Sequence, residues 1–329
     1  MAARLHPAPP EEMVDLRRLS ARDLEPLLRE ESAAWRQELD WDFEKSADLV
    51  RRFVDLRALN GFALVEHGQV TGYVYYVLEE NKGLLGDLYV RRALRTPGRE
   101  DWLLEAALDQ AVGFEEAYRV ECQLMMLSSA GVNQPCAPRY AAWCRSFERN
   151  FMRIDLRQAR LTDPRLHRPV VFERWSDHYH DAAASLIATA YASHIDSRIN
   201  DQYRSISGAR RFLYNIVQYP GCGTFYRPAS YAAFEPASGR ICGVSLASLV
   251  AVDCGHITQI CVSDAFRGCG VGYELLRRSL TSLRDAQCRF ASLTVTAANT
   301  EAVNLYESVG FETRRRFSAF VWEGFGTPR

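Results

Sequence analysis

The sequence predicts an α/β chain made of two tandem copies of one fold. The first observation is an apolar stretch, Ile257 to Val262, that passes through a glycine-rich turn into an amphipathic stretch, Tyr273 to Leu283. This order is typical of a strand, a tight turn and a helix. The second observation is a set of landmarks in the first half that recurs in the same order in the second half. With 329 residues, the chain is long enough for two cores of ordinary domain size.

The glycine-rich turn reads Arg267-Gly268-Cys269-Gly270-Val271-Gly272. Residues without side chains let several backbone N–H groups converge at the positive end of a helix, where they can hold a pyrophosphate. The spacing matches neither G-x-G-x-x-G nor G-x-x-x-x-G-K-[ST]. Taken alone, the turn therefore also fits a plain strand-to-helix connection.

A second motif, Ala297 to Phe311, follows the strand-like stretch Phe290 to Thr296 and contains Asn299 and Tyr306. Together the two motifs resemble the GNAT superfamily of acyl-CoA-dependent N-acetyltransferases. The resemblance implies a mixed, mostly antiparallel sheet flanked by helices in each copy, with acetyl-CoA as the co-substrate.

The resemblance also implies roles for individual residues. The glycine loop would bind the pyrophosphate of coenzyme A, and the strand before it would diverge from its neighbour and offer backbone groups to the pantetheine arm. Tyr306 matches the position whose hydroxyl often protonates the departing thiolate. The implied coenzyme A contacts are Ile260, Cys261, Val262, Arg267, Gly268, Cys269, Gly270, Val271, Gly272, Tyr273 and Asn299.

Transfer to an amine requires a group that accepts the amine's proton, directly or through water. Many family members use a glutamate six residues before the position of Val262, and here that position is His256. A histidine with an unperturbed pKa of about 6.5 can act as a base near neutral pH. The alternative is a strand histidine that is merely hydrogen-bonded. Asp253 is the second candidate, and it also fits a turn residue.

The acceptor is expected to contact the segment Tyr191 to Arg211, which carries both signs of charge. The candidate substrate residues are Tyr191, His194, Asp196 and Thr258. Thr258 is included because the two-residue period of a strand places it on the same face as His256. Mixed charge favours a polar or zwitterionic small molecule, although such a segment also fits a solvated helix face.

The first half repeats these landmarks in degenerate form. Leu88-Tyr89-Val90 parallels Ile260 to Val262, and Arg95 to Glu100 falls on the glycine loop. Glu100 stands where Gly272 stands, which would place a carboxylate against the phosphates, and Pro97 removes a backbone donor. We therefore predict a degenerate domain at 1–162 and a catalytic domain at 163–329, a tandem layout similar to that of mycothiol synthases.

Composition excludes several other classes of function. A net charge of −1 gives no reason to expect nucleic acid as a partner, and no apolar run is long enough for a membrane span. The nine cysteines lack metal-ligand spacing, so we expect no metal and a reducing cytoplasm.

The leading prediction is an N-acetyltransferase for a small-molecule amine. The alternatives are a GNAT-like malonyl decarboxylase that passes the acyl group to a carrier-protein thiol, and a non-enzymatic acyl-CoA-binding protein.

Overall fold

The computed structural model describes residues 11–79, 81–114, 117–127, 137–219 and 221–325. It divides into two compact units. Unit 1 comprises residues 1–37, 43–147 and 317–329, and unit 2 comprises residues 38–42 and 148–316. The predicted boundary after residue 162 differs from this division, because the segment 148–162 belongs to unit 2 and the C-terminal segment belongs to unit 1.

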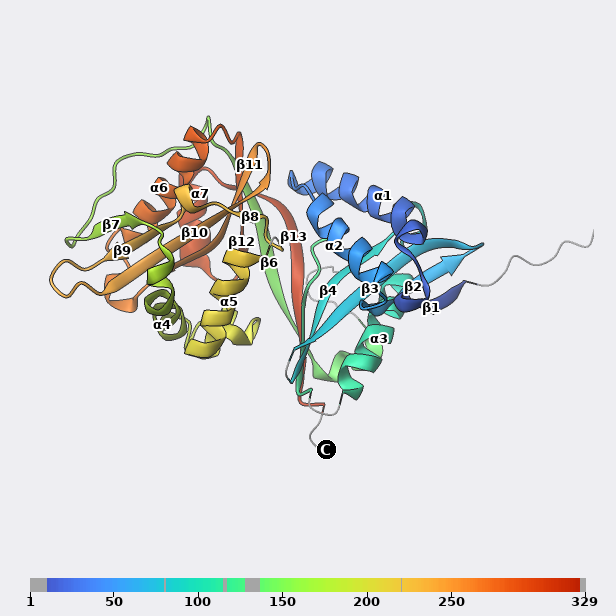
Figure 1. Cartoon of the computed structure of the whole chain (residues 1–329). Helices are drawn as coiled ribbons and strands as arrows, with labels where there is room; N and C mark the ends of the chain where they lie inside the picture. Colours follow the sequence, from blue (N-terminus) through green and yellow to red (C-terminus); the bar gives the residue numbers. More distant parts are fainter. Residues whose placement is uncertain (1–10, 80, 115–116, 128–136, 220, 326–329) are drawn as a thin grey trace, which may run out of the picture. The chain divides into compact units, whose positions relative to one another are not determined.

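Unit 1 contains a mixed sheet in the order β1-β2-β3-β4-β5-β13 (Figure 1). All neighbours in this sheet are antiparallel except β4 and β5, which are parallel. Helix α3 packs its leucines on one face of the sheet, while Tyr73 on the other face donates a hydrogen bond to Glu31 of α1. The elements are β1 (Glu12–Asp15), α1 (Ala21–Leu39), α2 (Glu44–Asp55), β2 (Asn60–Glu66), β3 (Gln69–Glu79), β4 (Lys82–Val90), α3 (Pro97–Gly113) and β5 (Arg119–Gln123).

Unit 2 repeats this plan in the order β6-β12-β11-β10-β9-β7, with the short β8 on β10. Here β11 and β12 form the parallel pair. Helix α6 covers one face of the sheet together with α7, and α4 and α5 cover the other. The elements are β6 (Cys144–Asp155), β7 (Val171–Arg174), α4 (His180–Ala190), α5 (Ile206–Gln218), β8 (Thr224–Phe225), β9 (Tyr231–Phe234), β10 (Ile241–Ala251), β11 (Cys254–Val262), α6 (Val271–Asp285), β12 (Phe290–Thr296), α7 (Thr300–Val309) and β13 (Glu312–Glu323).

The repeat predicted from the sequence has a structural counterpart. In each unit the parallel ladder has four residue pairs, Lys82–Leu85 with Arg119–Cys122 and Cys254–Ile257 with Phe290–Leu293. Both units are therefore mixed, mostly antiparallel sheets flanked by helices, which confirms the predicted fold class.

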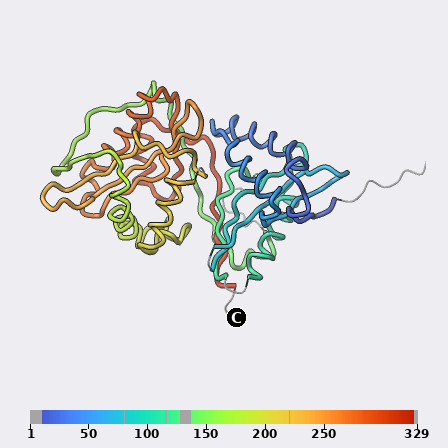
Figure 2. The backbone as a smooth tube through the Cα atoms, viewed as in Figure 1, coloured from blue at the N-terminus to red at the C-terminus, as the bar shows by residue number. Residues whose placement is uncertain are grey.

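Strands β6 and β13 each contribute to both units (Figure 2). In unit 2, residues 149–155 of β6 pair with β12. In unit 1, residues 319–323 of β13 pair with β5, and Phe320 and Trp322 are fully buried against leucines of α3. The core of unit 1 therefore depends on a strand from the far end of the chain.

We predict that Trp322→Ala lowers the free energy of unfolding of unit 1 by about 3–5 kcal/mol, the usual cost of emptying a buried tryptophan site. Urea denaturation followed by circular dichroism measures this cost. Trp102→Ala is the matched control, because Trp102 lies on α3 with 41% of its surface exposed. An equal loss in both variants would contradict the assignment of β13 to this core.

Candidate active site

The site is built around the point where β11 and β12 separate. Their parallel pairing ends at Ile257 and Leu293, although β11 continues to Val262 and β12 to Thr296. A cavity of about 790 Å³ lies there, a volume typical of small-molecule sites. It is lined by Ile257–Val262, Leu293–Val295, part of the loop before α6, and residues of α7.

The glycine loop adopts a conformation that other residues would not tolerate. Gly268 and Gly270 have φ angles of 69° and 84°, and a Cβ on Gly270 would lie 2.4 Å from the carbonyl oxygen of Arg165. Gly270 caps α6, which begins at Val271. The first N–H groups of a helix have no partner inside the helix. Since Gly270 and Gly272 line the cavity, these donors are available to an anionic ligand.

Nine of the eleven predicted coenzyme A residues line this cavity. Cys269 and Val271 do not line it, and both pack into a hydrophobic cluster with Leu275. Arg267 lines the cavity edge, where its guanidinium donates to the carbonyl of Ala190 at 3.1 Å. The nine lining residues are Ile260, Cys261, Val262, Arg267, Gly268, Gly270, Gly272, Tyr273 and Asn299.

Tyr306 and Asn299 reach the cavity from α7. Tyr306 is buried, and burial raises the pKa of its hydroxyl above the usual value, so the group stays protonated at neutral pH. Asn299 is the N-cap of α7, where its side-chain oxygen accepts a hydrogen bond from the N–H of Ala302. The amide nitrogen of Asn299 lies 3.2 Å from Nε2 of His194.

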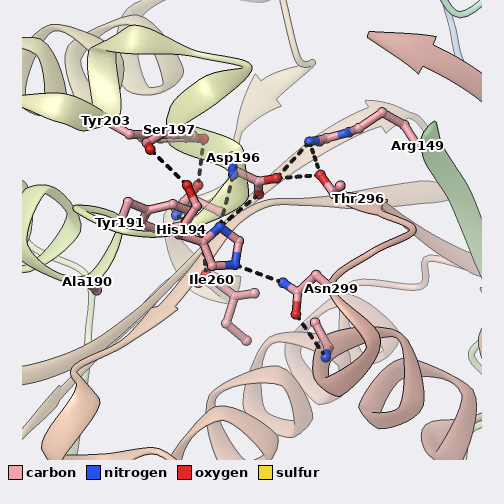
Figure 3. A network of polar contacts seen from close by, with 12 residues as sticks. Arg149, Ala190, Tyr191, His194, Asp196, Ser197, Tyr203, Ile260, Thr296 and Asn299 are labelled. Atoms are coloured by element: carbon pink, nitrogen blue, oxygen red, sulfur yellow. Dashed lines mark hydrogen bonds and ion pairs between the residues drawn. The ribbon is translucent and has the colours of Figure 1, made fainter. Parts of the chain in front are cut away.

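A polar network that includes Asn299 and His194 also lines the cavity (Figure 3). Oδ1 of Asp196 accepts from Arg149 Nη1 at 3.3 Å and also from the hydroxyl of Thr296. Arg149 Nη1 also donates to Thr296 Oγ1 at 2.9 Å. The backbone N–H of Asp196 donates to Nδ1 of His194, which fixes the short turn that carries both side chains. The structure thus brings together the predicted substrate residues His194 and Asp196.

Gln259 joins β11 to two partly buried tyrosines in the same region. Its Nε2 donates to the Tyr191 hydroxyl at 3.0 Å, and its Oε1 accepts from the Tyr203 hydroxyl at 3.2 Å. The rings of Tyr191 and Tyr203 stack at 4.5 Å, and burial raises the pKa of both hydroxyls. Both tyrosines therefore act as neutral groups that shape the cavity wall.

His256 lies elsewhere. It is buried beside Trp41, with ring centroids 5.0 Å apart, and its Nδ1 is 2.9 Å from Ser292 Oγ. Burial lowers the pKa of His256 to about 3. His256 is not among the residues that line the cavity, so the structure does not bring the predicted base to the predicted co-substrate site.

His256 lies where β11 is still paired with β12, opposite Ser292, whereas Thr258 lies beyond the end of this pairing and lines the cavity. A β-bulge also separates the two residues. Leu246 of β10 pairs with Gln259 and Ala247 pairs with Ile257, which leaves Thr258 as the extra residue and breaks the predicted two-residue period. Asp253 lies in the turn between β10 and β11, where its carbonyl accepts from the N–H groups of Arg289 and Phe290. It too is absent from the cavity lining.

The cavity-lining residues that the sequence analysis did not name as site residues include Arg149, Tyr203 and Gln259. Arg149 was missed because the sequence analysis assigned β6 to the first domain. A polar residue within an otherwise apolar strand was the available signal for Gln259.

The equivalent region of unit 1 is built differently. When Val90 is aligned with Val262, Pro97 corresponds to Cys269, so α3 begins two residues earlier than α6 and includes part of the former loop. The hydroxyl of Thr96 accepts from the N–H of Arg99 and caps α3. Glu100 is buried 3.7 Å from Arg95. The N-terminal end of α3 is therefore occupied by side chains of unit 1 itself.

The described residues contain no group of three or more histidine, cysteine or acidic side chains placed to hold a metal. Among the helices that the structure describes, none is long and apolar enough to cross a membrane.

The sequence and the structure were compared with known protein families and with solved structures. Residues 193–311 match the family model "Acetyltransferase (GNAT) family". No match was found among the curated proteins. A GCN5-related N-acetyltransferase from Sphaerobacter thermophilus is similar in structure, with a TM-score of 0.66, 19% identity and coverage of 95% of each chain.

Two further structures have the same fold. A tandem GNAT protein from the clavulanic acid biosynthesis pathway gives a TM-score of 0.59 at 18% identity, over 97% of this chain and 100% of that one. A glucosamine N-acetyltransferase region of a fungal β-N-acetylglucosaminidase gives 0.61 at 15% identity, over 97% of this chain and 38% of that one. The match to the GNAT family model therefore covers residues 193–311 of unit 2, and the chain as a whole shares the fold of a tandem GNAT protein.

Proposed function

We propose that this protein transfers an acetyl group from acetyl-CoA to the amine of a small polar molecule, directly and within the cavity of unit 2. The observation that carries the proposal is that the parted strands, the glycine loop and Tyr306 line one cavity. The free thiols of the described cysteines fit the reducing cytoplasm that we propose for this activity.

The residues of the cavity fit coenzyme A. The N–H groups at the start of α6 would hold the pyrophosphate, because Gly270 and Gly272 leave the backbone accessible. The backbone of β11 beyond Ile257, which β12 does not pair, would hydrogen-bond the pantetheine arm. This arrangement would place the thioester toward Tyr306 and the polar network.

We propose Asp196 as the proton acceptor, because its carboxylate lies in the cavity whereas His256 and Asp253 do not. Asp196 would take one proton from the ammonium group, and the neutral amine would attack the acetyl carbonyl. The C–N bond forms and the C–S bond breaks. The departing thiolate would take the proton of the Tyr306 hydroxyl, and the remaining proton on nitrogen would restore Tyr306 through solvent.

The first prediction from this proposal is one molecule of acetyl-CoA per chain in a calorimetric titration. Gly272→Glu should weaken binding on the order of 100-fold or more, because a carboxylate would face the phosphates. A Cβ on Gly272 meets only Val262 at 3.6 Å, so the variant should fold. Gly98→Glu is the matched control, since Gly98 lies in the first turn of α3, at the position equivalent to Gly270, with no neighbour within 4 Å of a Cβ. A stoichiometry near two would refute the single-site assignment.

Removal of the Tyr306 hydroxyl should affect chemistry rather than binding. Tyr306→Phe keeps the ring packed against Phe311, so the affinity for acetyl-CoA should be preserved. Turnover should fall about 10²–10⁴-fold, the usual contribution of a general acid. Steady-state kinetics and calorimetry measure the two effects separately. A less than twofold change in kcat would leave Tyr306 with a packing role alone.

Substitution of the two candidate bases, Asp196 and His256, should have different effects on turnover. Asp196→Asn should remove most turnover, because the carboxylate in the cavity is lost. His256→Gln should retain turnover within about threefold, since general-base loss would cost far more. Measurement of kcat/KM for both variants decides which residue is the base. A larger loss of kcat/KM in His256→Gln than in Asp196→Asn would identify His256 as the base.

His256→Gln also predicts a change in the pH dependence of stability. The folded-state pKa of about 3 lies below the unfolded value of about 6.5, so the unfolded chain binds the extra proton between them. The free energy of unfolding should therefore fall as the pH drops from about 6.5 toward 3. The variant should flatten this slope. An unchanged slope would show that His256 is not held neutral by burial.

A further inference from the structure

The acceptor end of the cavity contains a cation that the sequence analysis did not assign. Arg149 comes from β6, and its side chain is 11% exposed. Its Nη1 is occupied, because it donates to Thr296 and Asp196. The guanidinium is thus held in one place by two acceptors from different parts of unit 2 (Figure 3).

Of the three guanidinium nitrogens, only Nη1 makes hydrogen bonds with the residues that the structure describes. Nε of Arg149 is buried and has no hydrogen-bond partner among the residues that the structure describes. Buried N–H groups are nearly always paired, and a charged donor without a partner is especially costly. Nη2 also makes no hydrogen bond within the described part of the chain, and Arg149 lines the cavity, so a ligand oxygen can bind the guanidinium from the cavity. Guanidinium groups are particularly suited to carboxylate oxygens.

The neighbouring carboxylate of Asp196 also has an oxygen that remains available to a ligand. Oδ1 of Asp196 accepts from Arg149 and Thr296, whereas Oδ2 lies 3.8 Å from Nδ1 of His194. Oδ2 can therefore receive an ammonium group. Arg149 and Asp196 together form a neutral pair, so a ligand with one positive and one negative group leaves no net charge in the buried site. A polycation would leave an uncompensated charge there, which is unfavourable.

We propose that the acceptor is a zwitterion with a carboxylate next to the reactive amine, as in an α-amino acid. Arg149 binds the carboxylate and Asp196 receives the ammonium group. This inference rests on the proposed acetyl transfer and specifies its substrate class. If Arg149 only oriented Asp196, its loss would slow the acetylation of every amine equally.

The test compares three pools of acceptors with acetyl-CoA: α-amino acids, the corresponding α-carboxamides, and amines without a carboxyl group such as polyamines and amino sugars. Mass spectrometry identifies the products. We expect the wild type to prefer the best acid over its amide by about 10- to 100-fold in kcat/KM, the range for a hydrogen bond between charged groups.

The Arg149→Met variant should lose this preference. Any loss caused by the changed surroundings of Asp196 is shared by the acid and the amide. The ratio of kcat/KM for the acid to kcat/KM for the amide should therefore fall by about the same 10- to 100-fold. Arg153→Met is the matched control. Arg153 lies on the same strand and outside the cavity lining, where it pairs with Asp40 and stacks on Phe290. This control should keep the preference.

The remaining outcomes distinguish the inference of a zwitterionic acceptor from the proposed acetyl transfer. Equal losses for acid and amide in Arg149→Met would overturn the inference, as would acetylation of only the amines without a carboxyl group. The latter result would leave the proposed acetyl transfer intact. If no pool is acetylated, the proposed transfer fails. Ligand-observed NMR with the amino-acid pool then decides the inference: binding that Arg149→Met abolishes supports it, and absence of binding overturns it.

Discussion

The separation of β11 and β12 after Ile257 and Leu293 is the constraint on which the site depends. Each strand is held along its other edge, because β10 pairs with β11 through Val262 and β6 pairs with β12 through Thr296. β11 and β12 can therefore separate while each remains hydrogen-bonded to its other neighbour. The backbone that is left unpaired faces a cavity. The glycine loop follows the end of β11 and α7 follows the end of β12, so both motifs line this opening.

Unit 1 shows that the opening alone does not make a site. Its parallel ladder also ends early, at Leu85, and β4 has a bulge at Gly86 in the position equivalent to Thr258. There the ring of Tyr75 packs so closely that a Cβ on Gly86 would lie 2.0 Å from it. The helix that follows is capped by Thr96. The two units share a backbone plan, and the side chains at the bulge and at the helix start distinguish them.

The sequence predicted those parts of the site that depend on local spacing. The glycine loop, Asn299 and Tyr306 lie in continuous motifs, so their place could be predicted without knowledge of the sheet. His256 illustrates the limit of such reasoning, because it lies where β11 is still paired with β12, and local spacing does not predict where that pairing ends. Arg149 illustrates another limit. Its strand contributes to both units, and pairing between residues so distant in the chain has no local signature.

Amide hydrogen exchange with and without acetyl-CoA tests the central claim most directly. The claim is that the parted strand and the glycine loop of unit 2 bind the co-substrate, and that their counterparts in unit 1 do not. Acetyl-CoA should slow exchange in peptides covering 258–262 and 268–273, and should leave peptides covering 86–100 unchanged. Protection of 86–100, or no protection of either unit 2 segment at saturating acetyl-CoA, would contradict the account.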